Sequence, residues 1–201
     1  MLQRPVLYAL LPALTLALGG CLFETSLDAK GGGTMTATTA VEKDEFPRTK
    51  KTMESSVVKL KSAELVGTGA RTDGVFKLEF SDASKLQTTQ YFRNLRVTRA
   101  EGAKKGTMLI TATMKNGNPL HLPDAMVERF GREVKVVVAF PGPVVESNGT
   151  ISGGNTVTWQ WGVKEFFNMP EVTMTATYGD AGAPAAEGAT DKTPAKAKSG
   201  T

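Results

Sequence analysis

The chain has 201 residues, of which 40% are hydrophobic and 22% charged, and its formal net charge is +4 at pH 7. This composition is typical of a globular protein. The single cysteine excludes an internal disulfide and a multi-thiolate metal site, and the single histidine excludes a site with several imidazole ligands. Basic residues are not interleaved with aromatic ones, so we expect no nucleic-acid partner, and nothing predicts a cofactor.

The first 21 residues have the pattern of an export signal. Arg4 supplies a positive charge, residues 6–18 are almost continuously apolar, and Leu18-Gly19-Gly20-Cys21 follows. The apolar run is too short for a stable membrane span. Its end resembles a bacterial lipobox, which implies that residues 1–20 are removed and that acyl chains on Cys21 hold the protein on a membrane. The alternative is an ordinary signal peptide followed by a buried thiol.

Composition divides the remaining chain into three parts. Residues 21–33 end in three glycines and are predicted to form a flexible tether behind the lipidated cysteine. Residues 34–178 are predicted to form one domain, and residues 179–201, which contain no large apolar side chain, a disordered tail. Leu22 follows the cysteine where an aspartate would direct retention. We therefore expect an envelope location, on the outer membrane if the cell has two membranes.

Alternation of apolar and polar residues predicts most of the strands. It is present over 34–41, 74–80, 94–98, 107–114, 155–161 and 172–178, and the nearly continuous apolar run 134–140 predicts a more central strand. The polar side of several of these strands is rich in threonine, and a sheet with one buried and one wet face favours antiparallel pairing. Helices are predicted over 49–65, 82–92 and 122–130, although Val57 and Val58 leave a strand possible. The prediction is an α+β domain: a curved antiparallel sheet with about three helices packed on its apolar face.

One segment resembles a known family. The sequence F-P-G-P-V at 140–144 is followed by Asn148-Gly149 and by T-V-T-W at 156–159. This combination resembles the LppM-type lipoprotein domain of bacterial envelopes. The resemblance implies an envelope lipoprotein whose α+β domain is similar to lipid-binding folds. Many members carry a C-terminal transmembrane helix, and this chain has the Ala/Pro/Gly/Lys-rich tail in that place.

Residues that could carry chemistry are few. His121 could act as a base oriented by Asp124, but a loop histidine with a structural role is the favoured interpretation. We therefore predict that the protein is not an enzyme and assign no catalytic or metal-binding residue. Trp159 and Trp161 lie on the apolar side of one predicted strand, where packing in the core is favoured. The alternative is that they line an apolar cavity, with Ile110, Met126 and Phe130 as further candidate walls.

Two functions are compatible with these patterns. The first is a non-catalytic envelope lipoprotein whose membrane-tethered domain binds a lipid or another apolar ligand. The alternative is a structural or assembly module that docks another envelope protein through its threonine-rich face or the apolar cluster at Phe166-Phe167. A cavity large enough for a chain would support the first function. A filled core with an exposed apolar patch would support the second.

Overall fold

The computed structural model describes residues 20–67, 72–117 and 133–179, together with the single positions Pro123, Asp124, Val127 and Gly131. The expected signal segment before Gly20 lies outside the described residues, as does the tail after Gly179. The same holds for most of the helix predicted at 122–130, including Met126 and Phe130, and for His121.

The larger of two sheets has seven strands. Across the sheet their order is β3 (Val58–Val66), β4 (Asp73–Phe80), β2 (Gly33–Ala40), β1 (Gly20–Leu27), β7 (Glu133–Ala139), β10 (Thr156–Gly162) and β9 (Thr150–Ser152). Neighbouring strands are antiparallel except β1 and β7, which run parallel. This sheet is therefore mixed, whereas an antiparallel sheet was predicted.

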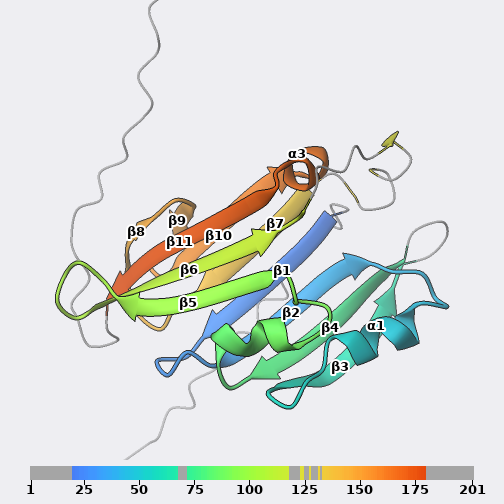
Figure 1. Ribbon diagram of the computed structural model, residues 1–201, viewed down its shortest axis with the longest axis horizontal. Helices are drawn as coiled ribbons and strands as arrows, with labels where there is room; N and C mark the ends of the chain where they lie inside the picture. The colour runs from blue at the N-terminus through green and yellow to red at the C-terminus, as the bar shows by residue number, and fades with distance from the viewer. Residues whose placement is uncertain are drawn as a thin grey trace, which may run out of the picture.

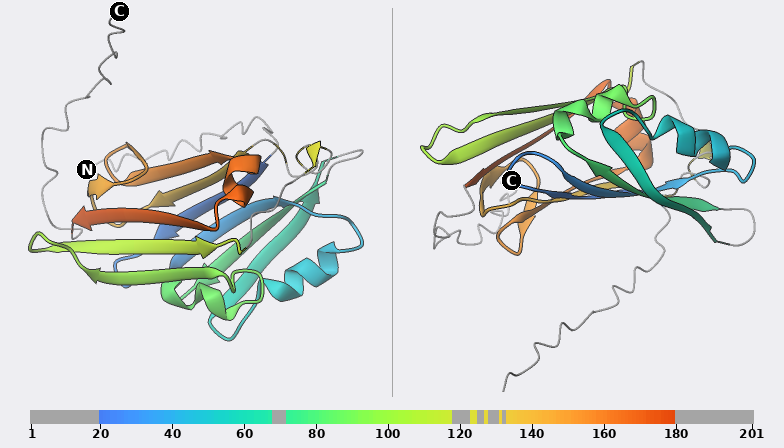
Figure 2. Two further views of the ribbon diagram at one scale, coloured as in Figure 1. Left: turned by 45° about the horizontal axis from the view of Figure 1, so that its top comes forward. Right: turned by 90° about the horizontal axis from the view of Figure 1, so that it is seen from below.

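The smaller sheet has four antiparallel strands in the order β5 (Leu95–Glu101), β6 (Thr107–Lys115), β11 (Glu171–Gly179) and β8 (Val144–Ser147). Its strands lie as a second layer over the central part of the larger sheet (Figures 1 and 2). Strands β8 and β9 follow each other in the chain but belong to different sheets. The turn between them therefore joins the two layers along one side.

The main core lies between the two sheets. One cluster of buried side chains contains Phe76, Leu78, Val157 and Trp159 from the larger sheet and Ile110, Met174, Ala176 and Tyr178 from the smaller one. The predicted threonine faces point away from this core. In β11, for example, Met174 and Ala176 are buried and alternate with the more exposed Thr173, Thr175 and Thr177.

The described helices are short and lie at the margins of this core. They are α1 (Phe46–Thr52), the 3-10 helix η1 (Ala83–Thr88) and α3 (Val163–Asn168). Phe46 of α1 packs on Phe76 with ring centroids 5.5 Å apart, and Leu86 of η1 joins the main cluster. The predicted mixture of strands and helices is present. The apolar face is covered mainly by a second sheet, however, and not by about three helices.

Residues 21–33 do not form the predicted flexible tether. Residues 21–27 belong to β1, which is paired on both sides, with β2 and with β7. A tight turn then leads into β2. In this turn the Asp28 carboxylate accepts hydrogen bonds from the backbone N–H groups of Lys30 and Gly32. Gly31 has a φ of 92°, which glycine adopts easily. The three glycines therefore form a hairpin turn and not a linker.

Two helix predictions also need correction. The segment predicted as one helix over 49–65 is divided into α1 and strand β3. Val57 and Val58 favour the extended conformation, because β-branched side chains pack well on a pleated surface. The segment predicted as a helix over 82–92 contains only η1, for which the Asp82 carboxylate caps the N–H of Ser84. Residues 166–170, expected to be a loop, lie partly in α3.

Tyr178 is buried in the main core without a partner for its hydroxyl among the described residues. Because an unpaired buried hydroxyl is costly, we expect Tyr178→Phe to raise the free energy of unfolding by about 1 kcal/mol, measured in urea. Tyr91→Phe is the matched control. Burial raises the pKa of the Tyr91 hydroxyl to about 12, and this hydroxyl bonds to Thr39. Because Tyr91→Phe removes that hydrogen bond, it should lower the free energy of unfolding by about 1 kcal/mol. Destabilisation by Tyr178→Phe would show that its hydroxyl is satisfied in solution.

Candidate functional site

A small apolar cavity lies between the two sheets. Its volume is about 80 Å³, and its walls include Met35, Leu86, Ile110, Val138, Trp159 and Met174. A cavity of this size has the volume of roughly two to three water molecules, whereas sites for drug-sized ligands span about 300–1,000 Å³. An acyl chain therefore cannot enter unless part of the wall moves.

The structure brings together two of the five residues predicted to line such a cavity. Ile110 of β6 and Trp159 of β10 both border it, from opposite sheets. Trp161 points to the same side of β10 but belongs to a second apolar cluster, where its ring centroid lies 5.6 Å from that of Phe166. The other two candidates, Met126 and Phe130, lie outside the described residues.

The Trp159 indole is held by a hydrogen bond that links the two sheets. Its Nε1 donates to Asn148 Oδ1 at 2.7 Å, and the same oxygen accepts from the backbone N–H of Thr175 at 2.8 Å. Asn148 Nδ2 also donates to the carbonyl of Thr173 at 2.8 Å. Asn148 therefore ties β10 of the larger sheet to β11 of the smaller sheet through one side chain.

The neighbours of Asn148 fix this arrangement. The Ser147 hydroxyl donates to the carbonyl of Thr175 at 2.7 Å and accepts from the N–H of Gly149 at 3.0 Å. A Cβ atom on Gly149 would lie 2.7 Å from Trp159 Nε1 and 2.8 Å from the carbonyl oxygen of Thr158. Only glycine allows this approach. The bond between Asn148 and Trp159 could not be predicted, because no local sequence pattern indicates a contact between sheets.

A surface groove lies on the other side of Trp159. Its volume is about 470 Å³, and its walls include Asn148, Thr150, Trp159, Gln160, Trp161, Glu171 and Thr173. Among the described residues, the lining contains amide and hydroxyl groups, one carboxylate and no basic side chain. Trp159 lines both the groove and the apolar cavity.

With this geometry described, the comparisons with known proteins identify the family. The LppM domain family matches residues 24–178. The chain belongs to the LppM domain family. Among solved structures, it is similar to the folded domain of the LppM protein of Mycobacterium tuberculosis, determined by NMR. The TM-score is 0.48 at 14% sequence identity, over 81% of this chain and 90% of that one. A search of curated proteins gave no match.

The residues that match the LppM family, 24–178, contain Asn148 and the cavity-lining residues Ile110 and Trp159. It also covers the segment whose resemblance to LppM domains was noted from F-P-G-P-V, Asn148-Gly149 and T-V-T-W. The predicted family is thereby confirmed. The match begins after Cys21, so it does not test the lipidation of that residue.

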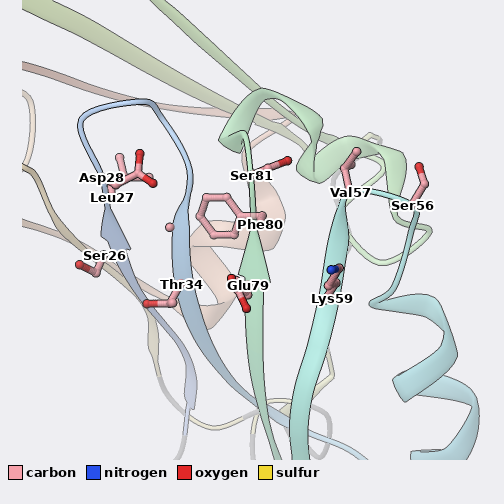
Figure 3. Close-up of a pocket in the computed structure, with 11 residues that line it drawn as sticks. Ser26, Leu27, Asp28, Thr34, Ser56, Val57, Lys59, Glu79, Phe80 and Ser81 are labelled. Atoms are coloured by element: carbon pink, nitrogen blue, oxygen red, sulfur yellow. The ribbon is translucent and has the colours of Figure 1, made fainter.

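A second surface pocket of this LppM domain lies at one end of strands β1 to β4. It measures about 650 Å³ and is lined on the outer side of the larger sheet by Ser26, Thr34, Lys59 and Glu79 (Figure 3). Lys61 forms an ion pair with Glu79 at 2.8 Å, and this contact lowers the pKa of the Glu79 carboxyl. Both side chains are more than half exposed, which is typical of a solvated sheet face.

Cys21 lies in strand β1, just before the residues that match the LppM family, and not in a linker. Its Sγ is 3.6 Å from the hydroxyl of Thr39, and the half-buried side chain packs against the second apolar cluster beside Val134 and Phe166. Phe167 and Met169 belong to the partly buried edge of the same cluster. The predicted lipidation site and the apolar segment at 166–170 therefore lie next to each other.

The remaining sequence candidates form no assembled site in the described part of the domain. Asp124 forms an ion pair with Lys164, which lowers the pKa of its carboxyl, while His121 lies outside the described residues. Within the described ranges, no three His, Cys, Asp or Glu side chains are grouped so that they could hold a metal ion. Nor do these ranges contain a helix with the length and apolar character needed to cross a membrane.

Proposed function

We propose that this LppM domain is the folded part of a non-catalytic envelope lipoprotein and binds a lipid or another apolar ligand between its two sheets. The observation that carries the proposal is the apolar cavity bordered by Ile110 and Trp159, with a larger groove directly outside Trp159. Membership of the LppM family supports the envelope location. Ligand binding requires the indole or the sheets to move, since a cavity of about 80 Å³ is too small for a chain.

The anchoring part of the proposal rests on Cys21. After cleavage before this residue, acyl chains attached to its thiol would extend from the domain surface next to Trp161, Phe167 and Met169. These side chains pack in the same cluster as Cys21. Because β1 starts here, the domain would lie directly at the bilayer without a flexible spacer. Leu22 after the cysteine favours the outer membrane in a cell that has two membranes.

Uptake of an uncharged fluorescent probe tests ligand binding. Purified Cys21→Ser protein is expected to take up N-phenylnaphthylamine at micromolar concentration, with an increase in probe emission. Ile110→Trp should abolish uptake by filling the cavity, with the circular dichroism unchanged. Thr111→Trp, on the outer face of the same strand, is the matched control and should bind normally.

Failure to take up the probe would contradict the ligand proposal. In that case Ile110→Trp would overpack a closed core and lower the free energy of unfolding by about 1–3 kcal/mol. The second candidate, a module that docks another envelope protein, would then be favoured. Val145 and Ile151 support it, because both are exposed large apolar residues of the successive strands β8 and β9, at 37% and 41%. The variant Val145→Ser/Ile151→Ser should then lose crosslinks to envelope proteins that Thr36→Ser retains.

A further inference from the structure

We infer that the groove outside Trp159 is the headgroup site and the entrance to the interior, and that its ligand is a single-chain amphiphile with an uncharged polar head. This inference rests on the proposed function, which states only that an apolar ligand binds between the sheets. It adds a route, a moving residue and a chemical class of ligand.

The route follows from the position of Trp159. Trp159 lines both the 80 Å³ cavity and the 470 Å³ groove, and its indole Nε1 donates to Asn148, which also lines the groove. If the ring turns into the groove, the two spaces become continuous and reach the range of volumes found in ligand sites. The opening is about one indole wide. It therefore admits one unbranched chain and excludes a lipid whose two chains enter side by side.

The hydrogen bonds around Asn148 allow this movement without separating the sheets. The indole makes one hydrogen bond, from Nε1 to Asn148 Oδ1. When that bond breaks, Asn148 still accepts from the N–H of Thr175 and donates to the carbonyl of Thr173. Ser147 also remains bonded to Thr175. Asn148 is thus a positioning residue that holds the indole closed and stays in place when the indole moves.

The groove lining selects the head of the ligand. Asn148, Gln160 and Thr173 offer amide and hydroxyl groups that donate to and accept from an uncharged hydroxylated head. Glu171 is the one ionisable side chain among the described residues of the lining, and it would repel a phosphate or carboxylate. In the strand registers, Lys115 lies opposite Glu171 and Lys135 opposite Gln160, but neither lines the groove. An anionic head would therefore lie beside the Glu171 carboxylate, with no basic side chain among the described residues of the lining to bind it.

Competition between matched ligands tests the head preference. Purified Cys21→Ser protein is loaded with N-phenylnaphthylamine, and the probe is displaced by a monoacylglycerol, by a fatty acid and by a lysophosphatidic acid of equal chain length, all below their micelle-forming concentrations. We expect the monoacylglycerol to displace the probe at a concentration at least tenfold lower than either anion. Gln160→Lys should improve displacement by both anions at least tenfold, and Thr150→Lys provides a second variant at the same groove. Thr36→Lys, on β2 outside the groove, should change nothing.

Tryptophan fluorescence tests the moving residue. The chain has two tryptophans, so Trp159 is the single tryptophan of the Trp161→Phe variant, and tryptophan fluorescence then reports on Trp159 alone. Monoacylglycerol should increase quenching of Trp159 by acrylamide at least twofold, because the indole leaves the core. Equal displacement of the probe by neutral and anionic ligands would overturn this inference, and so would acrylamide quenching that does not change at saturation. The proposed function would still be supported if the wild-type cavity takes up the probe and Ile110→Trp blocks that uptake. No probe uptake at all would overturn both.

Discussion

Replacement of Trp159 by alanine should lower the free energy of unfolding by about 3–5 kcal/mol. The indole is 6% exposed, packs in the main core between the sheets and donates a hydrogen bond to Asn148. Alanine removes this packing and enlarges a cavity that the surrounding strands cannot fully close. Because domains of this size have a total stability of about 5–15 kcal/mol, the variant should unfold at a much lower urea concentration.

Trp161→Ala is the matched control for this experiment. Trp161 is on the same strand and the same side, but it is only partly buried and packs on the second cluster. Its loss should therefore cost less, roughly half as much, since less apolar surface returns to water. A loss below about 1 kcal/mol for Trp159→Ala would contradict the packing described above and indicate that the indole borders a much larger space in solution.

Replacement of Cys21 by serine should either release the protein from the membrane fraction or leave it as an uncleaved precursor. Cys21 is the one cysteine in the chain, so no other thiol can carry the acyl chains. Serine is nearly isosteric and keeps a hydroxyl able to bond to Thr39, so the fold should persist. Fractionation of cells, together with the mass of the N-terminal peptide, would show either released protein or uncleaved precursor.

Ser26→Ala controls for disturbance of β1, because Ser26 is an exposed residue of the same strand and should leave both cleavage and membrane attachment unchanged. A Cys21→Ser protein that is cleaved at the same position and sediments with membranes would rule out the lipoprotein interpretation. It would then point to an apolar surface, such as Phe167 and Met169, as the means of attachment.

Most strands could be predicted from alternation alone. The predicted segments 74–80, 107–114, 134–140 and 172–178 agree with β4, β6, β7 and β11 to within a residue or two at each end. Strand β1 was missed although Phe23 and Leu27 alternate with polar residues, because the nearby glycines resembled a linker. Strand β3 was missed because Met53, Val57 and Leu60 also fit the spacing of a helix.

The arrangement of the sheets could not be predicted in this way. Periodicity shows which face of a strand is buried, but it does not show what covers that face. Three helices or a second sheet would produce the same alternation in β10 and β11. For the same reason the sequence placed Ile110 and Trp159 on apolar faces but did not indicate that they border one cavity, or that Asn148 joins the sheets.

The parallel pairing of β1 with β7 has a consequence for the order of events during export. Cys21 lies opposite Val134, so the centre of the larger sheet cannot close until the chain has emerged as far as β7. Pairings between segments this distant in sequence form slowly. During transport the start of β1 therefore remains unpaired on one side, and the thiol stays accessible to the enzymes that would modify and cleave the precursor. Completion of folding then pairs the strand on both sides and half-buries the thiol, so the proposed lipidation would precede folding.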